Sequence, residues 1–230
     1  MIVIPTYNEI DSLRPLAEEV LKVTPDHTHV LVVDDGSPDG TGKLADTIAN
    51  EHSRFHVLHR KKKMGLGTAY VAGFGWGIDK GYDAFIEMDA DFSHHPKYLA
   101  TMLDLLNRND VVIGSRYVKG GGTVNWGFGR RLLSRGGSLY SRGILCAPIR
   151  DFTGGFNGWH KRVLDAVNIG TLRSDGYSFQ IELKYRAFKK GFKIQEFPIV
   201  FEDRKLGKSK MNKKIVFEAL GRVWSFRFRT

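Results

Sequence analysis

The chain has 230 residues, of which 42% are hydrophobic and 26% are charged, a composition that supports a large folded core and excludes a wholly disordered chain. Its single cysteine, Cys146, excludes an intramolecular disulfide framework and a cysteine-based zinc finger. No stretch reaches the ~18 apolar residues of a membrane-spanning helix, and the N-terminus lacks a signal-peptide pattern. The net charge of +10 lies in residues 184–230, which hold 14 Lys and Arg residues against 4 Asp and Glu residues.

Short apolar runs alternate with helix-like stretches through the first half of the chain. Residues 1–4, 30–33, 55–58, 84–88 and 110–113 are the predicted strands. The first predicted helix follows Asn8, and its apolar face consists of Leu13, Leu16, Val20 and Leu21. Two further helices are predicted over residues 41–52 and 65–79. Strands separated by helices of this length indicate an α/β fold with a mostly parallel sheet covered by helices on both faces.

The pattern is less regular after residue 115. We expect a flexible turn at 120–122, a helix at 130–145, a glycine-broken loop at 151–158, a helix at 178–190 and an extended stretch at 192–201. No clean linker interrupts the chain, so we expect one domain with C-terminal additions.

Three polar clusters follow predicted strands, at residues 5–9, 34–37 and 89–91. In parallel sheets ligands bind at the carboxyl ends of the strands, so this convergence is the strongest functional signal in the sequence. Asp89 and Asp91 are spaced so that both can face Mg²⁺ or Mn²⁺, which bridge protein carboxylates to substrate phosphates. The DDGS run at 34–37 could be only a turn, or one of its carboxylates could bind the ribose or base of a nucleotide.

Other motifs narrow the chemistry. His94 and His95 are adjacent and have no partner at helical spacing, so we expect no transition-metal site there; Pro96 is expected to open a helix with His95 near its cap. The phosphate loop, the dinucleotide-binding glycine motif and the nucleophile elbow of serine hydrolases are all absent from the sequence.

Basic residues at predicted loops and element ends suit phosphate groups, because the planar fork of arginine binds two oxygens. They are Arg116, Arg130, Arg131, Arg204, Lys205, Lys208 and Lys210. Residues 204–210 are expected to form a mobile loop that closes over substrate phosphates.

In combination these motifs resemble the family 2 inverting glycosyltransferases, and within them the dolichyl- or polyprenyl-phosphate mannose synthases. The matching segments cover nearly the whole chain. They are VIPTYNE at 3–9, VDDGSPDGT at 33–41, MDADFSHHP at 88–96, GSRY at 114–117, LSRG at 133–136, DFTGGF at 151–156, and the pairs at 203–204 and 209–210.

The resemblance implies a GT-A, Rossmann-like fold, the donor GDP-mannose and the acceptor polyprenyl or dolichyl phosphate. The residues that would hold the nucleoside are Pro5, Tyr7, Glu9, Val33 and Asp35. Those that would lie at the diphosphate are Asp89, Ala90 and Asp91, with Arg116, Arg204 and Lys210 contacting phosphates.

The resemblance also implies a Mg²⁺ or Mn²⁺ ion, with Asp91 as principal ligand and Asp89 beside it. Ser93 stands where some relatives carry Gln, and its shorter side chain would bind the metal directly or through a water. Asp91, Arg204 and Lys210 would be the catalytic residues, because they would neutralise the leaving diphosphate. The acceptor phosphate is already anionic, so a strong general base is dispensable. In-line attack would invert the anomeric carbon and give polyprenyl-phosphate β-mannose and GDP.

The QxxRW signature of processive polysaccharide synthases is absent, which favours a single transfer. Residues 1–212 are expected to form the catalytic domain. Residues 213–230 are expected to form an amphipathic basic segment that lies on a membrane surface or packs on the domain. The implied location is cytoplasmic, peripheral on the cytoplasmic face of a membrane. The alternatives are transfer of glucose or N-acetylglucosamine from a UDP-sugar, a sugar nucleotidyltransferase, and a basic nucleic-acid-binding module, although no nucleic-acid partner is expected.

Overall fold

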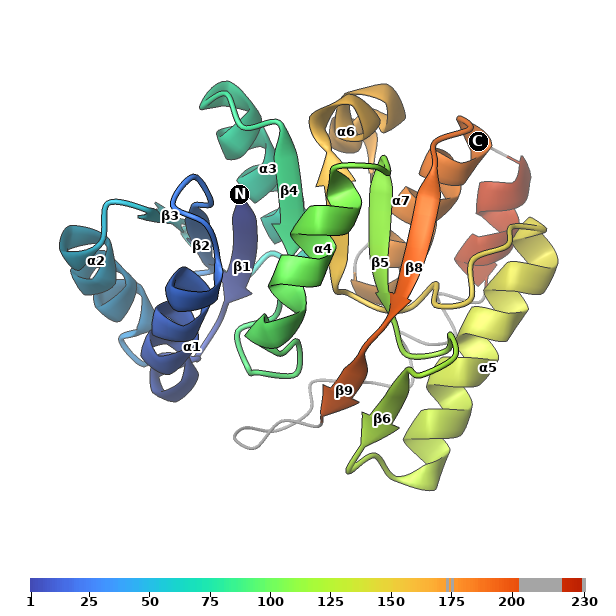
Figure 1. Cartoon of the computed structure of the whole chain (residues 1–230), viewed down its shortest axis with the longest axis horizontal. Helices are drawn as coiled ribbons and strands as arrows, with labels where there is room; N and C mark the ends of the chain where they lie inside the picture. The colour runs from blue at the N-terminus through green and yellow to red at the C-terminus, as the bar shows by residue number, and fades with distance from the viewer. Residues whose placement is uncertain (173, 175, 203–220, 229–230) are drawn as a thin grey trace.

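A computed structural model of the chain describes residues 1–172, 174, 176–202 and 221–228. Among these residues, seven strands form one sheet in the order β3-β2-β1-β4-β7-β5-β8, and a parallel pair, β6 and β9, lies below it (Figure 1). The strands are β1 (Ile2–Thr6), β2 (Val30–Asp34), β3 (Phe55–His59), β4 (Ala84–Glu87), β5 (Val111–Ser115), β6 (Gly122–Val124), β7 (Asn157–His160), β8 (Ile194–Pro198) and β9 (Val200–Glu202).

Helices cover both faces of the sheet, as the alternation of patterns predicted. One face packs against α1 (Ile10–Val23), α2 (Thr41–Glu51) and α4 (Leu99–Leu106), and the other against α3 (Leu66–Asp79), α6 (Lys161–Val167) and α7 (Gly176–Lys189). The long helix α5 (Phe128–Leu145) runs upward from beside β6 (Figure 1). The short helices η1 (Pro96–Tyr98) and η2 (Ile169–Thr171) complete this part of the fold. The predicted α/β fold is therefore confirmed.

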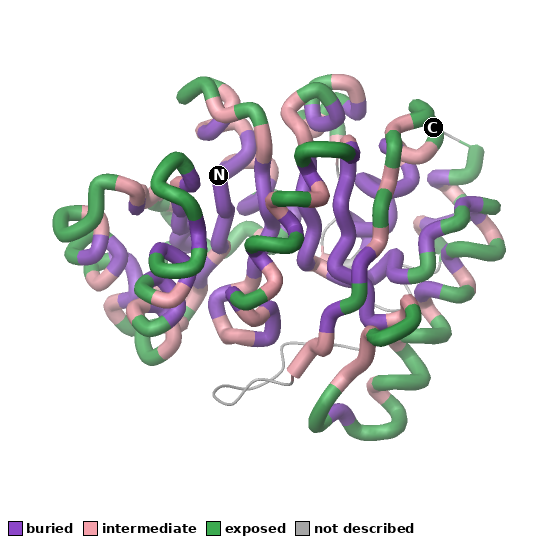
Figure 2. Tube along the Cα trace, in the orientation of Figure 1, coloured by how far each residue is buried: buried purple, intermediate pink, exposed green. Residues whose placement is uncertain are grey.

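Successive residues of the central strands enter opposite cores, which explains why these strands are apolar without interruption. In β1, Ile2 and Ile4 pack toward α1 and α4, whereas Val3 packs toward α3. The glycines of α3 allow this helix to approach the sheet closely. A Cβ atom on Gly73 would lie 2.5 Å from Val3 Cγ1. The tube in Figure 2 shows the resulting buried centre, with exposed residues on the outer helices.

Pro5 lies inside β1, where the sequence predicted that the strand would already have ended. β1 pairs with β2 through Thr6, but its pairing with β4 ends at Val3. The Met1 and Val3 carbonyls accept the N–H groups of Ile86, in β4, and of Met88, just after it. Because every second residue of a strand faces the same neighbouring strand, the backbone nitrogen of Pro5 also points to the side of β4. The missing N–H of proline therefore falls beyond the last β4 pairing and breaks no ladder bond.

Strand β7 is the main departure from the predicted topology. It runs antiparallel between β4 and β5, and its first two residues fall in the stretch predicted to be a loop. Its residues, Asn157 to His160, include no β-branched side chain, so no local pattern indicates a strand. Tertiary packing specifies it instead. Trp159 is fully buried, and a Cβ atom on Gly158 would lie 2.7 Å from Leu106 Cδ1 of α4.

A last helix covers residues 221–228, within the segment predicted to be amphipathic. Val223 and Phe226 are buried in the same core cluster as α6 and α7, so this helix packs on the domain. Trp224 and Phe228 remain exposed and stack on each other with ring centroids 6.2 Å apart. The proposed boundary at residue 212 lies outside the described residues. Within the part that is described, no helix is both long and apolar enough to cross a membrane.

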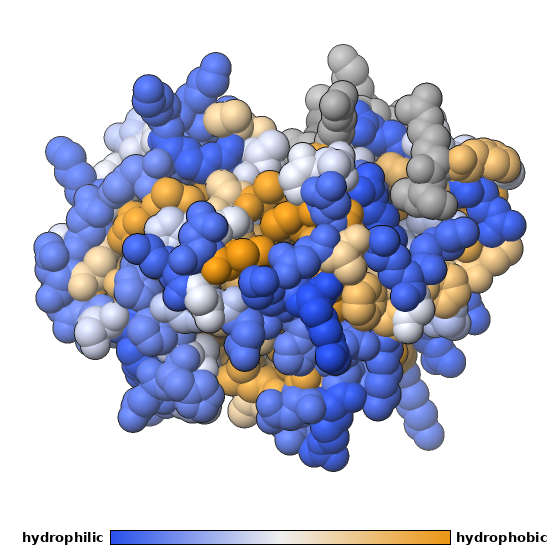
Figure 3. Space-filling view, turned by 90° about the horizontal axis from the view of Figure 1, so that it is seen from above, coloured by the Kyte–Doolittle hydropathy of each residue, from blue (hydrophilic) through white to orange (hydrophobic). Residues whose placement is uncertain are grey.

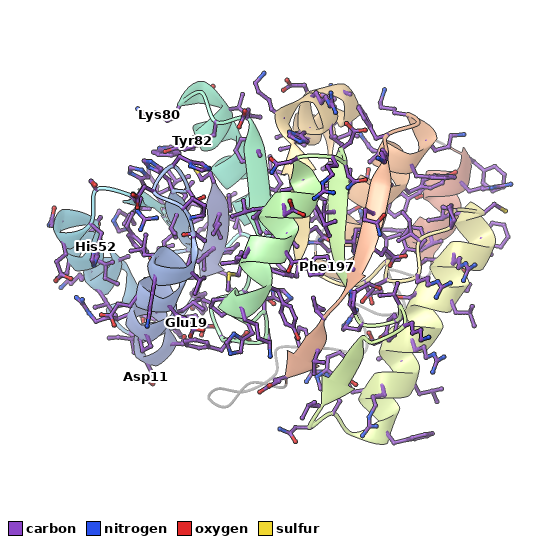
Figure 4. The ribbon with its side chains drawn as sticks, viewed as in Figure 1. Asp11, Glu19, His52, Lys80, Tyr82 and Phe197 are labelled. Carbon is purple, nitrogen blue, oxygen red and sulfur yellow. The ribbon has the colours of Figure 1, made fainter. Side chains whose placement is uncertain are left out.

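Contacts at the periphery fix the outer helices. The Glu19 carboxylate of α1 lies 3.5 Å from His95 Nδ1, and Phe197 packs edge-on against the ring of Tyr98 (Figure 4 labels Glu19 and Phe197). His95 also accepts the Lys97 N–H, which confirms the predicted cap of the helix that Pro96 opens. Figure 3 shows the end of the molecule at which the parallel strands begin, where hydrophilic side chains dominate the rim around an apolar centre.

Candidate active site

The ends of β1, β2 and β4 meet at one edge of the sheet, which we call the carboxyl edge because the parallel strands end there. The Asp35 N–H donates to the Thr6 carbonyl at 3.1 Å, and the Met88 N–H donates to the Val3 carbonyl at 3.1 Å. The polar clusters at 5–9, 34–37 and 89–91 are therefore neighbours in space, as the sequence predicted.

Asp34 organises the loop after β2. Its carboxylate accepts hydrogen bonds from Thr6 Oγ1 at 3.0 Å and from Ser37 Oγ at 2.6 Å. It also accepts the backbone N–H groups of Gly36 and Ser37, both at 3.1 Å. Four bonds to one buried carboxylate make Asp34 a turn-forming residue. Of the two alternatives for residues 34–37, a turn or a nucleotide contact, Asp34 therefore fits the turn.

Asp35 faces the loop that follows β3. Its carboxylate lies 3.0 Å from Arg60 Nη1 and accepts the Met64 N–H at 3.2 Å. Burial raises the pKa of Asp35, although the arginine and the N–H group oppose that shift. The same loop carries Lys63, whose Nζ lies 4.4 Å from the centre of the Tyr7 ring. Asp35 and Tyr7 thus share one basic loop that the sequence analysis did not single out.

The loop from β1 to α1 is tied to the loop after β2. The Asn8 N–H donates to Ser37 Oγ at 3.0 Å, and the Glu9 N–H donates to Thr41 Oγ1 at 2.9 Å. Asn8 adopts a left-handed conformation with a φ of 59°, which asparagine tolerates better than most residues. Pro5, Tyr7 and Glu9 are all half-buried at this edge.

Val33 pairs with Pro5 near the carboxyl edge, but its side chain does not face that edge. It is fully buried in β2, where its side chain faces α3. Because core residues already surround this side chain, the structure does not favour a contact between it and a nucleoside. Ala90 is also buried, so its backbone is the part that lies between the two aspartates.

The loop after β4 presents two carboxylates. Asp89 and Asp91 are both half-buried, and Asp91 Oδ1 accepts the Ser93 N–H at 3.1 Å and the Ser93 hydroxyl at 2.5 Å. Ser93 itself is buried. This arrangement fits a Mg²⁺ or Mn²⁺ ion, because such ions take one or two carboxylates and complete their coordination with water and substrate phosphates. Among the described residues no group of three or more His, Cys, Asp or Glu side chains could hold a metal ion.

His94 holds the backbone of this loop in place. Its Nδ1 accepts the Asp89 N–H at 3.0 Å, and its ring packs 5.1 Å from the Phe156 ring and 5.4 Å from the Phe201 ring. The sequence predicted no transition-metal site here and did not indicate this positioning role. Only its adjacency to the aspartates could have suggested one.

We predict that His94→Phe lowers both stability and turnover, because it leaves the partly buried Asp89 N–H without the acceptor that His94 supplies. The expected loss in free energy of unfolding is about 1–3 kcal/mol. In His94→Asn the side-chain oxygen can take the place of Nδ1, so this matched variant should recover most of the loss. Urea unfolding and steady-state turnover of both variants would test the role. Equal losses in the two variants would contradict it.

Arg116 lies in a buried ion pair. Its Nε and Nη2 atoms donate to the two oxygens of Asp151 at 2.8 and 2.7 Å, and Nη2 also donates to Thr153 Oγ1 at 2.9 Å. The side chain is 4% exposed and that of Asp151 is fully buried. These bonds show that Arg116 positions the loop at 151–156. The direct phosphate contact predicted for Arg116 stays a prediction. Burial alone would raise the pKa of Asp151, but the charge and hydrogen bonds of Arg116 outweigh it and hold the pKa below its usual value.

A second buried cation holds the same loop from the other side. Lys184 Nζ, on α7, donates to the carbonyls of Asp151 at 2.9 Å and Gly154 at 2.7 Å. Burial lowers the pKa of Lys184 to about 8. Nearby, Asn157 Nδ2 donates to the buried Glu87 carboxylate at 2.6 Å. None of these residues stood out in the sequence, because their partners lie 30 or more positions away.

Arg204 and Lys210 lie outside the described residues, as does the whole predicted phosphate loop. The structure brings together Pro5, Tyr7, Glu9, Asp35, Asp89, Asp91 and Ser93 at the carboxyl edge. The roles of all the predicted ligand-binding residues stay predictions.

Comparison with known proteins shows which family shares this architecture. The model of the family described as glycosyl transferase family 2 matches residues 1–167. A polyprenol monophosphomannose synthase from Mycolicibacterium smegmatis is 46% identical over 233 residues, which cover 100% of this chain and 88% of that protein. An undecaprenyl-phosphate mannosyltransferase from Micrococcus luteus is 48% identical over 223 residues, which cover 97% of this chain and 91% of that protein.

Solved structures share the fold at lower identity. The glucosyl-3-phosphoglycerate synthase of Mycobacterium tuberculosis in complex with UDP superposes with a TM-score of 0.70 at 17% identity, covering 98% of this chain and 79% of that chain. The same enzyme with Mn²⁺, UDP and phosphoglyceric acid gives a TM-score of 0.72 at 16% identity, covering 99% of this chain and 78% of that one. The family model spans most of the chain, and two relatives exceed 45% identity over nearly all of it. The chain therefore belongs to glycosyltransferase family 2.

Proposed function

We propose that this protein transfers mannose from GDP-mannose to a polyprenyl phosphate and releases GDP. The observation that carries the proposal is the pair of half-buried carboxylates, Asp89 and Asp91, beside the loops that bear Tyr7 and Asp35. That combination suits a nucleoside diphosphate with a metal-bridged diphosphate. The names of the relatives at 46% and 48% identity supply the sugar and the lipid phosphate.

In this proposal the donor lies along the carboxyl edge. Its nucleoside faces Tyr7 and Asp35, and its diphosphate reaches the loop after β4. Asp91 and Asp89 would hold Mg²⁺ or Mn²⁺. The bound ion would supply positive charge at the leaving diphosphate. Arg204 and Lys210 would add to that charge.

The acceptor phosphate is anionic at neutral pH, so it needs orientation more than deprotonation. The loop at 151–156, fixed by Arg116 and Lys184, would give it a rigid wall. Attack from the face opposite the diphosphate inverts the anomeric carbon, which makes the product a β-mannosyl phosphate.

Two other functions compete with this one. Transfer from a UDP-sugar would use the same edge, and only the names of the relatives favour mannose. A nucleic-acid-binding module would leave the carboxylates at the edge without a purpose, since carboxylates repel phosphates unless a metal lies between them.

A donor panel tests the proposal directly. Labelled GDP-mannose, UDP-glucose and UDP-N-acetylglucosamine are each incubated with the full chain and a polyprenyl phosphate in detergent. We expect mannose alone to enter the lipid fraction, with release of GDP. Excess chelator should abolish transfer, and Mg²⁺ or Mn²⁺ should restore it. A lipid product labelled only from a UDP-sugar, or full transfer in chelator, would refute the proposal.

A further inference from the structure

Asn157, the first residue of β7, contacts three separate parts of the candidate site with one amide group. Its Nδ2 donates to Glu87 Oε2 at 2.6 Å, to Gln180 Oε1 at 2.8 Å and to the Gly154 carbonyl at 3.2 Å. Glu87 ends β4, Gly154 lies in the loop at 151–156, and Gln180 belongs to α7. Because a carbonyl oxygen can only accept, the nitrogen of the Asn157 amide must be the atom that points to this junction.

The junction is closed to water. Glu87 and Asn157 are 0% exposed, Gln180 is 2% exposed, and Glu87 lies directly opposite Asn157 in the antiparallel pair of β4 and β7. Buried carboxylate and amide groups cost free energy unless they are hydrogen-bonded. Apolar side chains of similar volume often fill such a position at a lower cost. The polar groups therefore point to a role other than filling the core.

Two of the three acceptors lead directly into the loops of the site. Glu87 lies two residues before Asp89, the first carboxylate of the loop after β4. Gly154 is in the middle of the loop at 151–156, and its carbonyl also accepts Lys184 Nζ at 2.7 Å. The Asn157 amide therefore joins the start of one loop to the centre of the other.

His94 makes a second contact between the same two loops. Its Nδ1 accepts the Asp89 N–H at 3.0 Å, and its ring lies 5.1 Å from the ring of Phe156. A Cβ atom on Gly155 would lie 3.5 Å from His94 Cε1, which is ordinary van der Waals contact. The loops are thus held against each other at two points, of which only the junction at Asn157 consists of hydrogen bonds between them.

We propose that Asn157 is a positioning residue for the transfer reaction, which holds the loop after β4 in register with the loop at 151–156 through Glu87 and Gly154. The inference rests on the proposed function for what the loops carry, which is the donor diphosphate on the first and the acceptor phosphate on the second. The alignment of the acceptor with the anomeric carbon then depends on an amide that touches neither substrate. A displacement of about 1 Å between reacting groups can cost about 100-fold in rate.

Amide hydrogen exchange tests the coupling between the loops without any sugar transfer. The full chain is exchanged alone, with GDP and Mg²⁺, and with UDP and Mg²⁺. In wild type the bound nucleotide should slow exchange in residues 88–94 and also in residues 151–156. Asn157→Leu keeps a similar volume but cannot donate. In this variant the slowing at 88–94 should remain, and the slowing at 151–156 should shrink by at least about tenfold.

Asn109→Leu is the matched control. Asn109 Nδ2 donates to the Leu105 carbonyl at 2.8 Å, and the residue precedes β5 at the opposite end of the sheet from the candidate site. Both variants replace a buried, hydrogen-bonded amide with leucine, and both should unfold at lower urea concentrations than wild type. Asn109→Leu should keep the nucleotide response of both segments and the turnover of wild type.

Kinetics of the partner residue provide an independent test. Glu87→Gln keeps an oxygen that can accept the Asn157 amide, whereas Glu87→Leu does not. Asn157→Leu and Glu87→Leu should each lower kcat at least about tenfold while KM for the donor stays within about threefold of wild type. Glu87→Gln should stay within about threefold in both. The double variant Asn157→Leu/Glu87→Leu should lose no more than the weaker single variant, because both changes remove the same bond.

Three results would overturn the positioning role. They are equal slowing at 151–156 in wild type and Asn157→Leu, a wild type whose residues 151–156 do not respond while residues 88–94 do, and a loss of kcat in Asn109→Leu as large as that in Asn157→Leu. Failure of the proposed function looks different. If UDP slows exchange at 88–94 and GDP does not, the proposed donor is wrong, but the response of residues 151–156 to UDP still reports whether Asn157 couples the loops.

Discussion

Asp91→Asn should reduce turnover by at least about 100-fold while the protein stays folded. Asparagine keeps an oxygen that can accept the two Ser93 bonds, so the loop after β4 should hold its shape. It lacks the negative charge that a divalent cation requires of its principal ligand. Removing one group that stabilises developing charge costs ~10²–10³ in turnover in well-studied enzymes, which sets the expected scale.

Steady-state kinetics and circular dichroism of Asp91→Asn would measure the two parts of this prediction. The matched control is Asp104→Asn, which removes the carboxylate of Asp104, on α4, from an exposed ion pair with Arg108. The control should keep wild-type turnover. Raising the concentration of Mg²⁺ should recover little activity in Asp91→Asn. Turnover within a few-fold of wild type would show that Asp91 is not the principal metal ligand.

Arg116→Met should lower the free energy of unfolding by about 3–5 kcal/mol, because it leaves the Asp151 carboxylate buried and without its partner. Arg108→Met removes the arginine of the exposed pair with Asp104, whose side chains are 68% and 59% exposed. That control should change stability by at most about 1 kcal/mol. Urea unfolding of both variants near neutral pH provides the comparison.

Lowering the pH should reduce the difference in free energy of unfolding between Arg116→Met and wild type. In wild type the pKa of Asp151 is held below its usual value, so its stabilising contribution is present above that value and is lost as the pH falls through the folded pKa. In the variant, burial is no longer opposed by Arg116, so Asp151 takes up a proton more readily. The double variant Arg116→Met/Asp151→Asn should recover part of the loss at neutral pH. If the loss in free energy of unfolding did not change with pH and the double variant recovered none of it, lost packing of the Arg116 side chain would be the cause.

The sequence predicted the carboxyl edge well because that prediction depends on local patterns alone. An apolar run followed by a polar cluster identifies the end of a buried strand, and parallel strands end at the same edge. The pattern of residues was therefore enough to place Asp89 and Asp91 beside Pro5 and Asp35.

Residues whose roles depend on distant partners could not be assigned in the same way. The charge of Arg116 suggested a contact with a phosphate. Nothing near it in the sequence indicated that Asp151, 35 positions later, would pair with it. The sequence also could not assign different roles to the adjacent residues Asp34 and Asp35. Only the fold shows that Asp34 forms the turn and that Asp35 faces Arg60.

The antiparallel strand β7 has a consequence for the order in which the chain can fold as it is synthesised. β4 and β5 never pair with each other, because β7 lies between them, and β5 finds its other neighbour only in β8. Both partners are made after β5, so an emerging chain can complete the block β3-β2-β1-β4 but must hold β5 without a neighbour until residue 157 has left the ribosome. Unpaired strand edges of this kind favour association with other chains. A product that terminates early, before Asn157, would therefore leave one edge of β4 and both edges of β5 unpaired, and would not be a smaller form of the same fold.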